Sequence, residues 1–115
     1  MTDGPMREPT FLVLTALAGD PRHGYAVLED IAAMTDGRVR LRAGTLYAAL
    51  DRLRTEGLIE VDREEIVQSR LRRYYRLTGA GVRSLTAETA RLRAQATIAE
   101  RRLSARWTEL GGATA

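Results

Sequence analysis

The side chains in this sequence that are best suited to chemistry are its arginines, and the chemistry they favour is phosphate binding. All 18 basic residues are arginine, and the planar guanidinium group can donate two parallel hydrogen bonds to phosphate oxygens. Two stretches without any acid concentrate them: residues 38–50 contain three arginines and residues 66–87 contain five. A GC-rich coding genome would also favour arginine over lysine, so the positions of the arginines carry the argument.

Other reactive side chains lack the neighbours that catalysis or metal binding requires. The chain contains one histidine, His23, and no cysteine, so neither a set of metal ligands nor a disulfide is predicted. Ser69, Ser84 and Ser104 have no base in sequence context that would make them nucleophiles. The sequence has no glycine-rich phosphate loop and no carboxylate pair that demands an enzyme. We therefore expect no cofactor and no catalytic site.

Length and composition indicate a single domain. The chain has 115 residues, of which 44% are hydrophobic, and a net charge of +3, which suits one compact core. Residues 1–8 lack the apolar stretch of a signal peptide. The longest apolar run, at residues 11–18, is far below the ~20 residues that cross a bilayer. We therefore expect a cytoplasmic protein with no membrane partner and a flexible N-terminus at residues 1–8.

Three helices are predicted in the first half of the chain. Residues 8–18 are apolar nearly all round, which indicates burial on more than one face. Residues 24–34 repeat apolar positions at spacings of three and four. The third helix covers residues 43–56 and ends before Gly57, a typical position for a left-handed cap. Its apolar residues share one face, and the opposite face carries polar residues around the small Ala48.

Two short strands and a long helix follow. Residues 58–62 and 72–77 are rich in branched and aromatic residues, as strands are, and we expect their long polar connection to be mobile. The final helix begins after Thr78, a typical N-cap residue, and ends near residue 110. Residues 111–115 are expected to be a disordered tail. Apolar and small residues recur along the helix with the spacing of a coiled-coil seam: Val82, Leu85, Thr89, Leu92, Ala96, Ala99 and Leu103.

Three helices followed by a two-stranded hairpin is the element order of a winged helix-turn-helix, which we predict for residues 9–78, with a C-terminal dimerisation helix at residues 79–110. The fold class is therefore mostly α with a small β-hairpin. Helix-turn-helix proteins place such a third helix in the major groove, with its N-terminal residues nearest the bases. The two arginine stretches flank this helix, where the phosphates of double-stranded DNA would pass. The residues predicted to contact DNA on this basis are Arg40, Arg42, Gly44, Thr45, Ala48, Arg52, Arg70, Arg72 and Arg73.

Within that set we predict a division of roles. Thr45 and Arg52, on the third helix, should matter more for the choice of sequence. Arg42 and Arg72 should matter about equally on any duplex, because contacts to phosphate carry no sequence information.

Four segments of the sequence, residues 21–25, 44–53, 56–59 and 72–81, together resemble the PadR-like transcriptional regulators in order and spacing. The resemblance covers about residues 10–103. It implies a homodimeric bacterial repressor that a small ligand releases from DNA. The single C-terminal helix looks like that of the shorter branch of the family, in which this helix crosses its twin and packs on the first helix.

The resemblance also implies roles for matched positions. Tyr25 and Tyr47 would lie near the DNA backbone, and Phe11 and Leu14 would face the partner subunit. Trp107 would form an aromatic wall for a small apolar or aromatic effector; the alternative for this residue is an ordinary packing or capping role. Two departures from the family pattern stand out: Ala48 replaces a proline that many members carry, and the wing tip at residues 64–69 lacks the usual glycines.

A second class of function stays open at this stage. Winged helices also serve as protein-interaction modules or bind RNA, and the exposed third helix would then be a docking surface. The basic stretches on either side of that helix favour DNA, because a protein dock would not need them.

Overall fold

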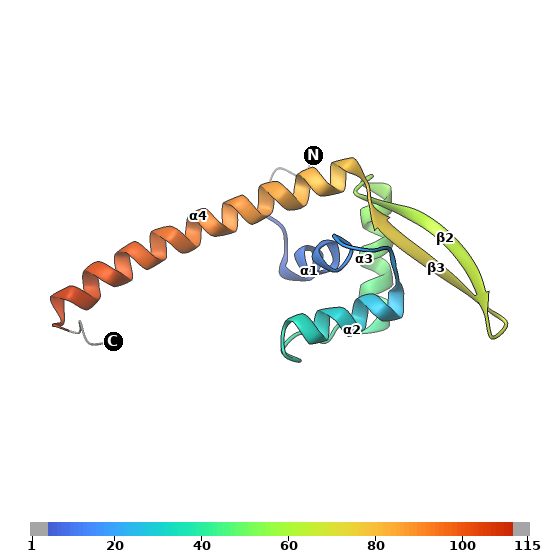
Figure 1. The fold of residues 1–115 in the computed structure, drawn as a ribbon, viewed down its shortest axis with the longest axis horizontal. Helices are drawn as coiled ribbons and strands as arrows, with labels where there is room; N and C mark the ends of the chain where they lie inside the picture. The colour runs from blue at the N-terminus through green and yellow to red at the C-terminus, as the bar shows by residue number, and fades with distance from the viewer. Residues whose placement is uncertain (1–4, 112–115) are drawn as a thin grey trace.

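The computed structural model describes residues 5–111, which form a helical body, a projecting β-hairpin and one long helix (Figure 1). The body contains α1 (Glu8–Ala16), α2 (Gly24–Met34) and α3 (Ala43–Thr55). The sheet contains β1 (Arg22–His23), β2 (Ile59–Val67) and β3 (Arg70–Leu77), and α4 (Gly79–Glu109) follows. None of the helices in the described part is long and apolar enough to cross a membrane.

The predicted flexible and disordered ends are only partly covered by the structure. Residues 1–4 of the predicted N-terminal segment and residues 112–115 of the predicted tail lie outside the described residues. Within the described part, Met6 packs against the core and Glu8 already begins α1.

The core is built where α1, α2 and α3 meet the base of the sheet. Its fully buried side chains include Leu14, Ile31, Leu46 and Leu50. The helix α1 is apolar on nearly all sides because the body surrounds it, and four of its nine residues are buried within the protomer. The prediction that Leu14 faces a partner subunit is therefore wrong for its side chain, which is fully covered by its own chain.

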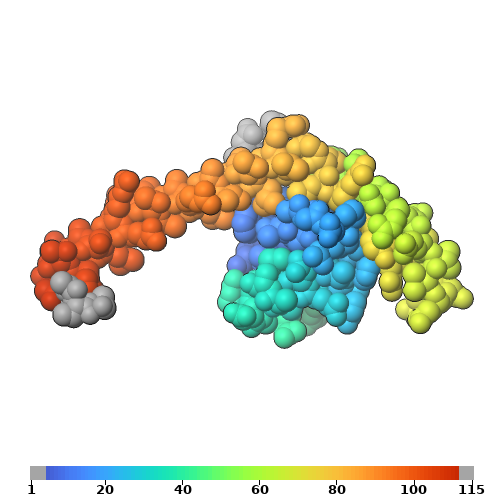
Figure 2. Space-filling model, in the orientation of Figure 1, coloured from blue at the N-terminus to red at the C-terminus, as the bar shows by residue number. Residues whose placement is uncertain are grey.

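The sheet differs from the sequence prediction in two ways. First, β1 is a third strand that was not predicted, and it pairs with β3 at Arg22↔Tyr75 and His23↔Tyr74. Second, the connection expected to be long and mobile is strand on both sides of a two-residue turn at Gln68 and Ser69. The polar character of the segment reflects strands that project from the body, as Figure 2 shows for the hairpin of β2 and β3. We call this hairpin the wing.

The junction between α3 and α4 fixes where the long helix leaves the body. Thr78 caps α4 as predicted: its hydroxyl oxygen accepts a hydrogen bond from the Gly81 amide at 3.0 Å. The same hydroxyl donates to the Gly57 carbonyl at 2.6 Å, and the Thr78 amide donates to the Leu58 carbonyl at 3.0 Å. Gly81 is buried here, and an added Cβ would overlap that Leu58 carbonyl oxygen.

Beyond the junction, α4 packs against α1 and β3 and then runs clear of the body (Figures 1 and 2). Leu85 is half-buried against the core of its own protomer. Further along, large apolar side chains are exposed: Leu92, Ile98, Leu103, Trp107 and Leu110. The molecule is consequently elongated, with extents of 64 × 31 × 22 Å.

A substitution at the junction tests this packing. Gly81→Ala should lower the free energy of unfolding by about 2 kcal/mol, because the added methyl group meets backbone that cannot turn away. Gly79→Ala is the matched control, since its Cβ would lie 3.4 Å from the mobile end of Arg83. The control should match or slightly exceed the wild type, because alanine favours a helix over glycine. Urea denaturation of the three proteins measures the difference, and equal stability of both variants would contradict this account of the junction.

Candidate nucleic-acid interface

A groove of about 550 Å³ runs between the N-terminal half of α3, the start of α2 and the wing. Five of the residues predicted to contact DNA line it together, although they come from three separate stretches of the chain: Tyr25, Tyr47, Arg70, Arg72 and Arg73. The groove also contains Asp51, the one acid among its lining residues. The fold therefore gathers much of the predicted site on one surface.

The exposed face of α3 agrees with the prediction from sequence. Leu46, Leu50 and Leu53 are fully buried, whereas Gly44, Thr45 and Ala48 are exposed. This division follows from the 3.6-residue period of the helix, which leaves one side without a packing partner.

The N-terminus of α3 is suited to binding an anion. Its N-cap residue, Arg42, makes no side-chain capping hydrogen bond, and the first turn contains no acid. The first amides of a helix have no intrahelical acceptor, and the helix dipole places positive charge at this end. Arg40 and Arg42 are both exposed beside it. Free amides and guanidinium groups at one point form an arrangement that binds phosphate.

The ring of Tyr47 packs closely on Gly24 at the N-terminus of α2, a contact that the sequence did not predict. An added Cβ on Gly24 would overlap the Tyr47 hydroxyl and would lie 2.7 Å from its Cζ atom. Gly24 is buried, while Tyr47 is 47% exposed and Tyr25 is 64% exposed. The absence of a side chain at Gly24 therefore lets the Tyr47 ring lie at the edge of the groove.

His23 has a structural role in this site. Its Nδ1 atom accepts a hydrogen bond from the Ala26 amide at 3.3 Å and so caps α2. Its ring packs edge-to-face on Tyr74, with the centroids 5.3 Å apart. Partial burial of the imidazole, and then the positive charge of Arg72, lower the pKa of His23. The neutral ring thus holds the start of α2 against the sheet.

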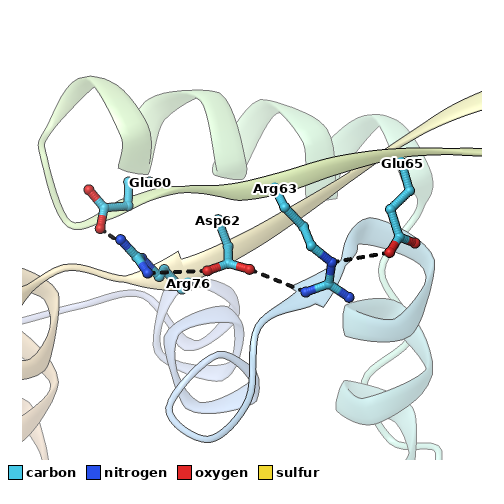
Figure 3. A network of polar contacts seen from close by, with 5 residues as sticks. All are labelled: Glu60, Asp62, Arg63, Glu65 and Arg76. Carbon is cyan, nitrogen blue, oxygen red and sulfur yellow. Dashed lines mark hydrogen bonds and ion pairs between the residues drawn. The ribbon is translucent and has the colours of Figure 1, made fainter.

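Ion pairs occupy many of the charges at the base of the wing (Figure 3). Arg76 contacts Glu60 at 2.8 Å and Asp62 at 3.1 Å, and Arg63 contacts Asp62 and Glu65 at 3.2 Å each. The Arg63 guanidinium also lies 3.8 Å from the centroid of the Tyr74 ring. Such exposed pairs add little stability, but together they order one face of the hairpin.

The same pairing separates the predicted wing arginines into two kinds. Arg73 donates to Glu64 at 2.8 Å, so its charge is already balanced. Among the described residues, Arg70 and Arg72 have no ion-pair partner within 4 Å, and both line the groove. These two arginines are the wing's available charges for a phosphate.

Arg52 does not join the groove. Its guanidinium donates to the Thr10 hydroxyl at 2.8 Å and lines a separate hollow of about 810 Å³ between α1, α3 and α4. Arg52 lies two helical turns beyond Thr45 on the same face, which is why the sequence pattern grouped the two residues. Its predicted role in choosing a base sequence finds no support in this geometry.

Comparisons with known proteins give one consistent result. The model of the "Transcriptional regulator PadR-like family" matches residues 13–87. A transcriptional regulator of Mycobacterium tuberculosis, Rv3488, is 40% identical over 65 residues, which is 56% of this chain and 47% of that protein. An uncharacterised protein of Lysinibacillus sphaericus is 29% identical over 61% of this chain and 64% of its own length. The chain thus matches about half to two thirds of these relatives.

Solved structures share the fold. A PadR family regulator from Eggerthella lenta has a TM-score of 0.68 and 29% identity, covering 83% of this chain and 80% of that one. Bacillus subtilis PadR, solved in complex with operator DNA, has a TM-score of 0.65 and 24% identity, covering 73% of this chain and 47% of that one.

The capping role of His23 predicts a pH dependence of stability. The unfolded chain, with a histidine pKa near 6.5, takes up the proton before the folded chain does. The free energy of unfolding should therefore fall as the pH drops from about 7 to about 5. His23→Asn keeps an acceptor at the cap but does not titrate in this range, so its stability should vary less. Urea denaturation across this range measures both proteins, and parallel curves would contradict the role of His23.

Proposed function

We propose that this chain, which belongs to the PadR-like family of transcriptional regulators, binds double-stranded DNA as a homodimer. In this proposal it represses transcription from an inverted-repeat operator and is released by a small ligand. The family consists of transcriptional regulators and not of enzymes, in agreement with the reading of the sequence.

The observation that carries the proposal is the exposed face at the N-terminal half of α3, with arginines on both sides that have no ion-pair partner among the described residues. Arg40 and Arg42 precede the helix, and Arg70 and Arg72 lie across the groove on the wing. A helix that enters the major groove needs an unpacked face and must have phosphates on either side. The structure of Bacillus subtilis PadR with operator DNA supports the same use of a similar fold.

In this arrangement the contacts divide by position. Thr45 and Ala48 would face the base edges, because they are exposed near the N-terminus of α3. Arg42 and the free amides beside it would hold a phosphate on one side, and Arg72 on the other. A protein-docking role would not need these cations around the helix.

Binding to duplex DNA should depend steeply on salt. The logarithm of affinity should fall linearly with the logarithm of salt concentration, with a slope of about 0.9 per phosphate neutralised. Arg42→Gln and Arg72→Gln should each weaken binding to any duplex and reduce the slope by about two per dimer, since each subunit contributes once. Thr45→Ala should instead reduce discrimination between sequences.

Fluorescence anisotropy with a labelled duplex at several salt concentrations measures these effects. Arg101→Gln is the control, because Arg101 is exposed on the distal part of α4 and away from the groove. A wild-type affinity that does not change with salt would count against DNA binding, and would favour a protein-docking role.

The homodimer is supported by the distal part of α4. Leu92, Ala96, Ala99 and Leu103 fall on one face at heptad spacing, and all four are exposed in the protomer. In the first turns Leu85 of the same seam packs on the body, whereas Val82 is 52% exposed. Where the body ends the apolar face continues, and a second α4 with the same pattern would cover it.

A charge placed on this face should separate the subunits. Leu103→Glu is expected to shift the protein from dimer to monomer, because two carboxylates would be buried without partners. Arg101→Glu also introduces an acid, but on the opposite face of the helix, and it should remain dimeric. Light scattering coupled to size-exclusion chromatography distinguishes the two. A monomeric wild type, or dissociation of both variants, would contradict the assignment of this face.

The proposal that a ligand releases the protein from DNA is based on the family resemblance and on the position of Trp107. Its indole is 45% exposed and lies beside the apolar face near Leu103 and Leu110. Pairing of two helices there would bring two aromatic walls to the interface, which suits a flat apolar or aromatic effector. A packing role in the dimer would use the same exposed surface.

A further inference from the structure

A bulge in β2 brings the charged side chains at the base of the wing onto one face. Side chains three residues apart on a regular strand point to opposite faces. The β3 partners of Glu60 and Arg63 are nevertheless two residues apart, and so they share a face. Asp62, which lies at the register shift between Val61 and Arg63, is the extra residue that resets the alternation. The bulge thus places acids and arginines side by side that would otherwise alternate.

Asp62 occupies the centre of the resulting network, whose five side chains are linked in a row along the hairpin (Figure 3). Its two carboxylate oxygens accept hydrogen bonds from different arginines, from Arg76 at 3.1 Å and from Arg63 at 3.2 Å. The side chain of Asp62 is 19% exposed, whereas the other four are at least 43% exposed. A carboxylate that is shielded from water interacts more strongly with its partners. Asp62 is therefore the member that holds both arginines in place.

Arg63 continues this network across the sheet to the body. Its guanidinium lies 3.8 Å from the centroid of the Tyr74 ring, and the other neighbour of that ring is His23. Arg63, Tyr74 and His23 form one register row across β2, β3 and β1. His23 is the N-cap of α2, and Gly24 after it packs on Tyr47 of α3. The row therefore connects the bulge to both helices on the far side of the groove.

We propose that Asp62 is a positioning residue, which holds Arg63 on the Tyr74 ring and thereby fixes the wing relative to the N-termini of α2 and α3. The backbone pairing beside α2 is short, since β1 has two residues whereas β2 has nine and β3 has eight. The row of side chains supplies the stiffness that so short a strand lacks. The role rests on the function proposed above, because a DNA site needs its two walls at a set separation.

The first measurement reads the position of the wing without DNA. The chain contains no cysteine, so spin labels can be attached at Ile66→Cys on the wing and Ala33→Cys on α2, both exposed positions. Excess unlabelled protein dilutes the labelled chain to one per dimer. Pulsed electron–electron double resonance should give a narrow distance distribution in the otherwise wild-type chain. The distribution should broaden in Asp62→Asn and in Arg63→Lys, because an ammonium group does not reproduce the planar fork of the guanidinium.

The second measurement is affinity for the duplex that wild-type protein enriches from a random pool. Asp62→Asn removes a negative charge, which by itself would favour DNA, yet it should weaken binding about tenfold. Glu64→Gln is the matched control, because it also removes one negative charge from the wing and breaks the ion pair with Arg73, outside the network. It should keep the narrow distance distribution and bind at least as tightly as the wild type. All melting temperatures should stay close to that of the wild type, since exposed ion pairs add little stability.

The outcomes separate this role from the proposed function. A distance distribution that Asp62→Asn leaves unchanged overturns the positioning role and leaves DNA binding standing. Equal loss of affinity in Asp62→Asn and Glu64→Gln also overturns it, because the loss would then not depend on the network. A wild type that enriches no duplex overturns both the proposed function and this role of Asp62.

Discussion

The arrangement of this protein depends on the contact between the start of α4 and the loop that follows α3. Gly81 lies against the Leu58 carbonyl, and Thr78 hydrogen-bonds to the backbone of Gly57 and Leu58. This one contact sets the end of α3, the root of the wing and the direction of α4. Positive φ at Gly57 makes the tight reversal possible, because side chains rarely adopt that conformation.

Ion pairs within the protein then determine which arginines remain available to bind anions. A net charge of +3 conceals a division between arginines that are already paired and arginines that are not. At the base of the wing, Arg63 and Arg76 are held by acids, so that region is ordered and close to neutral. Around the N-terminus of α3 and at the wing tip the acids are few, and Arg40, Arg42 and Arg70 are exposed. Pairing within the protein thus concentrates the attraction for anions on one side.

The sequence was a good guide wherever a feature depended on local pattern. The buried face of α3 and the cap at Thr78 follow from helix periodicity and from capping chemistry, and both are confirmed. Features that depend on distant neighbours were missed. The strand β1 forms only because β3 lies beside it. The wing turn contains no glycine, the residue that usually marks such a turn in a sequence. Leu14 was assigned to an interface from the family resemblance, whereas its side chain is covered by its own protomer.

The length of α4 gives the molecule a mechanical property. A helix of 31 residues is about 46 Å long and is fixed to the body at one end only. In a dimer joined through the distal half, the pair of helices acts as a lever whose fulcrum is the seam. The arm between the seam and the body is then about half the helix, about 23 Å, so a swing of about 10° moves the body by about 4 Å, more than the 3.4 Å step between base pairs. In the proposed dimer on DNA, such a swing would therefore change the separation of the two copies of α3 without altering any residue that contacts DNA.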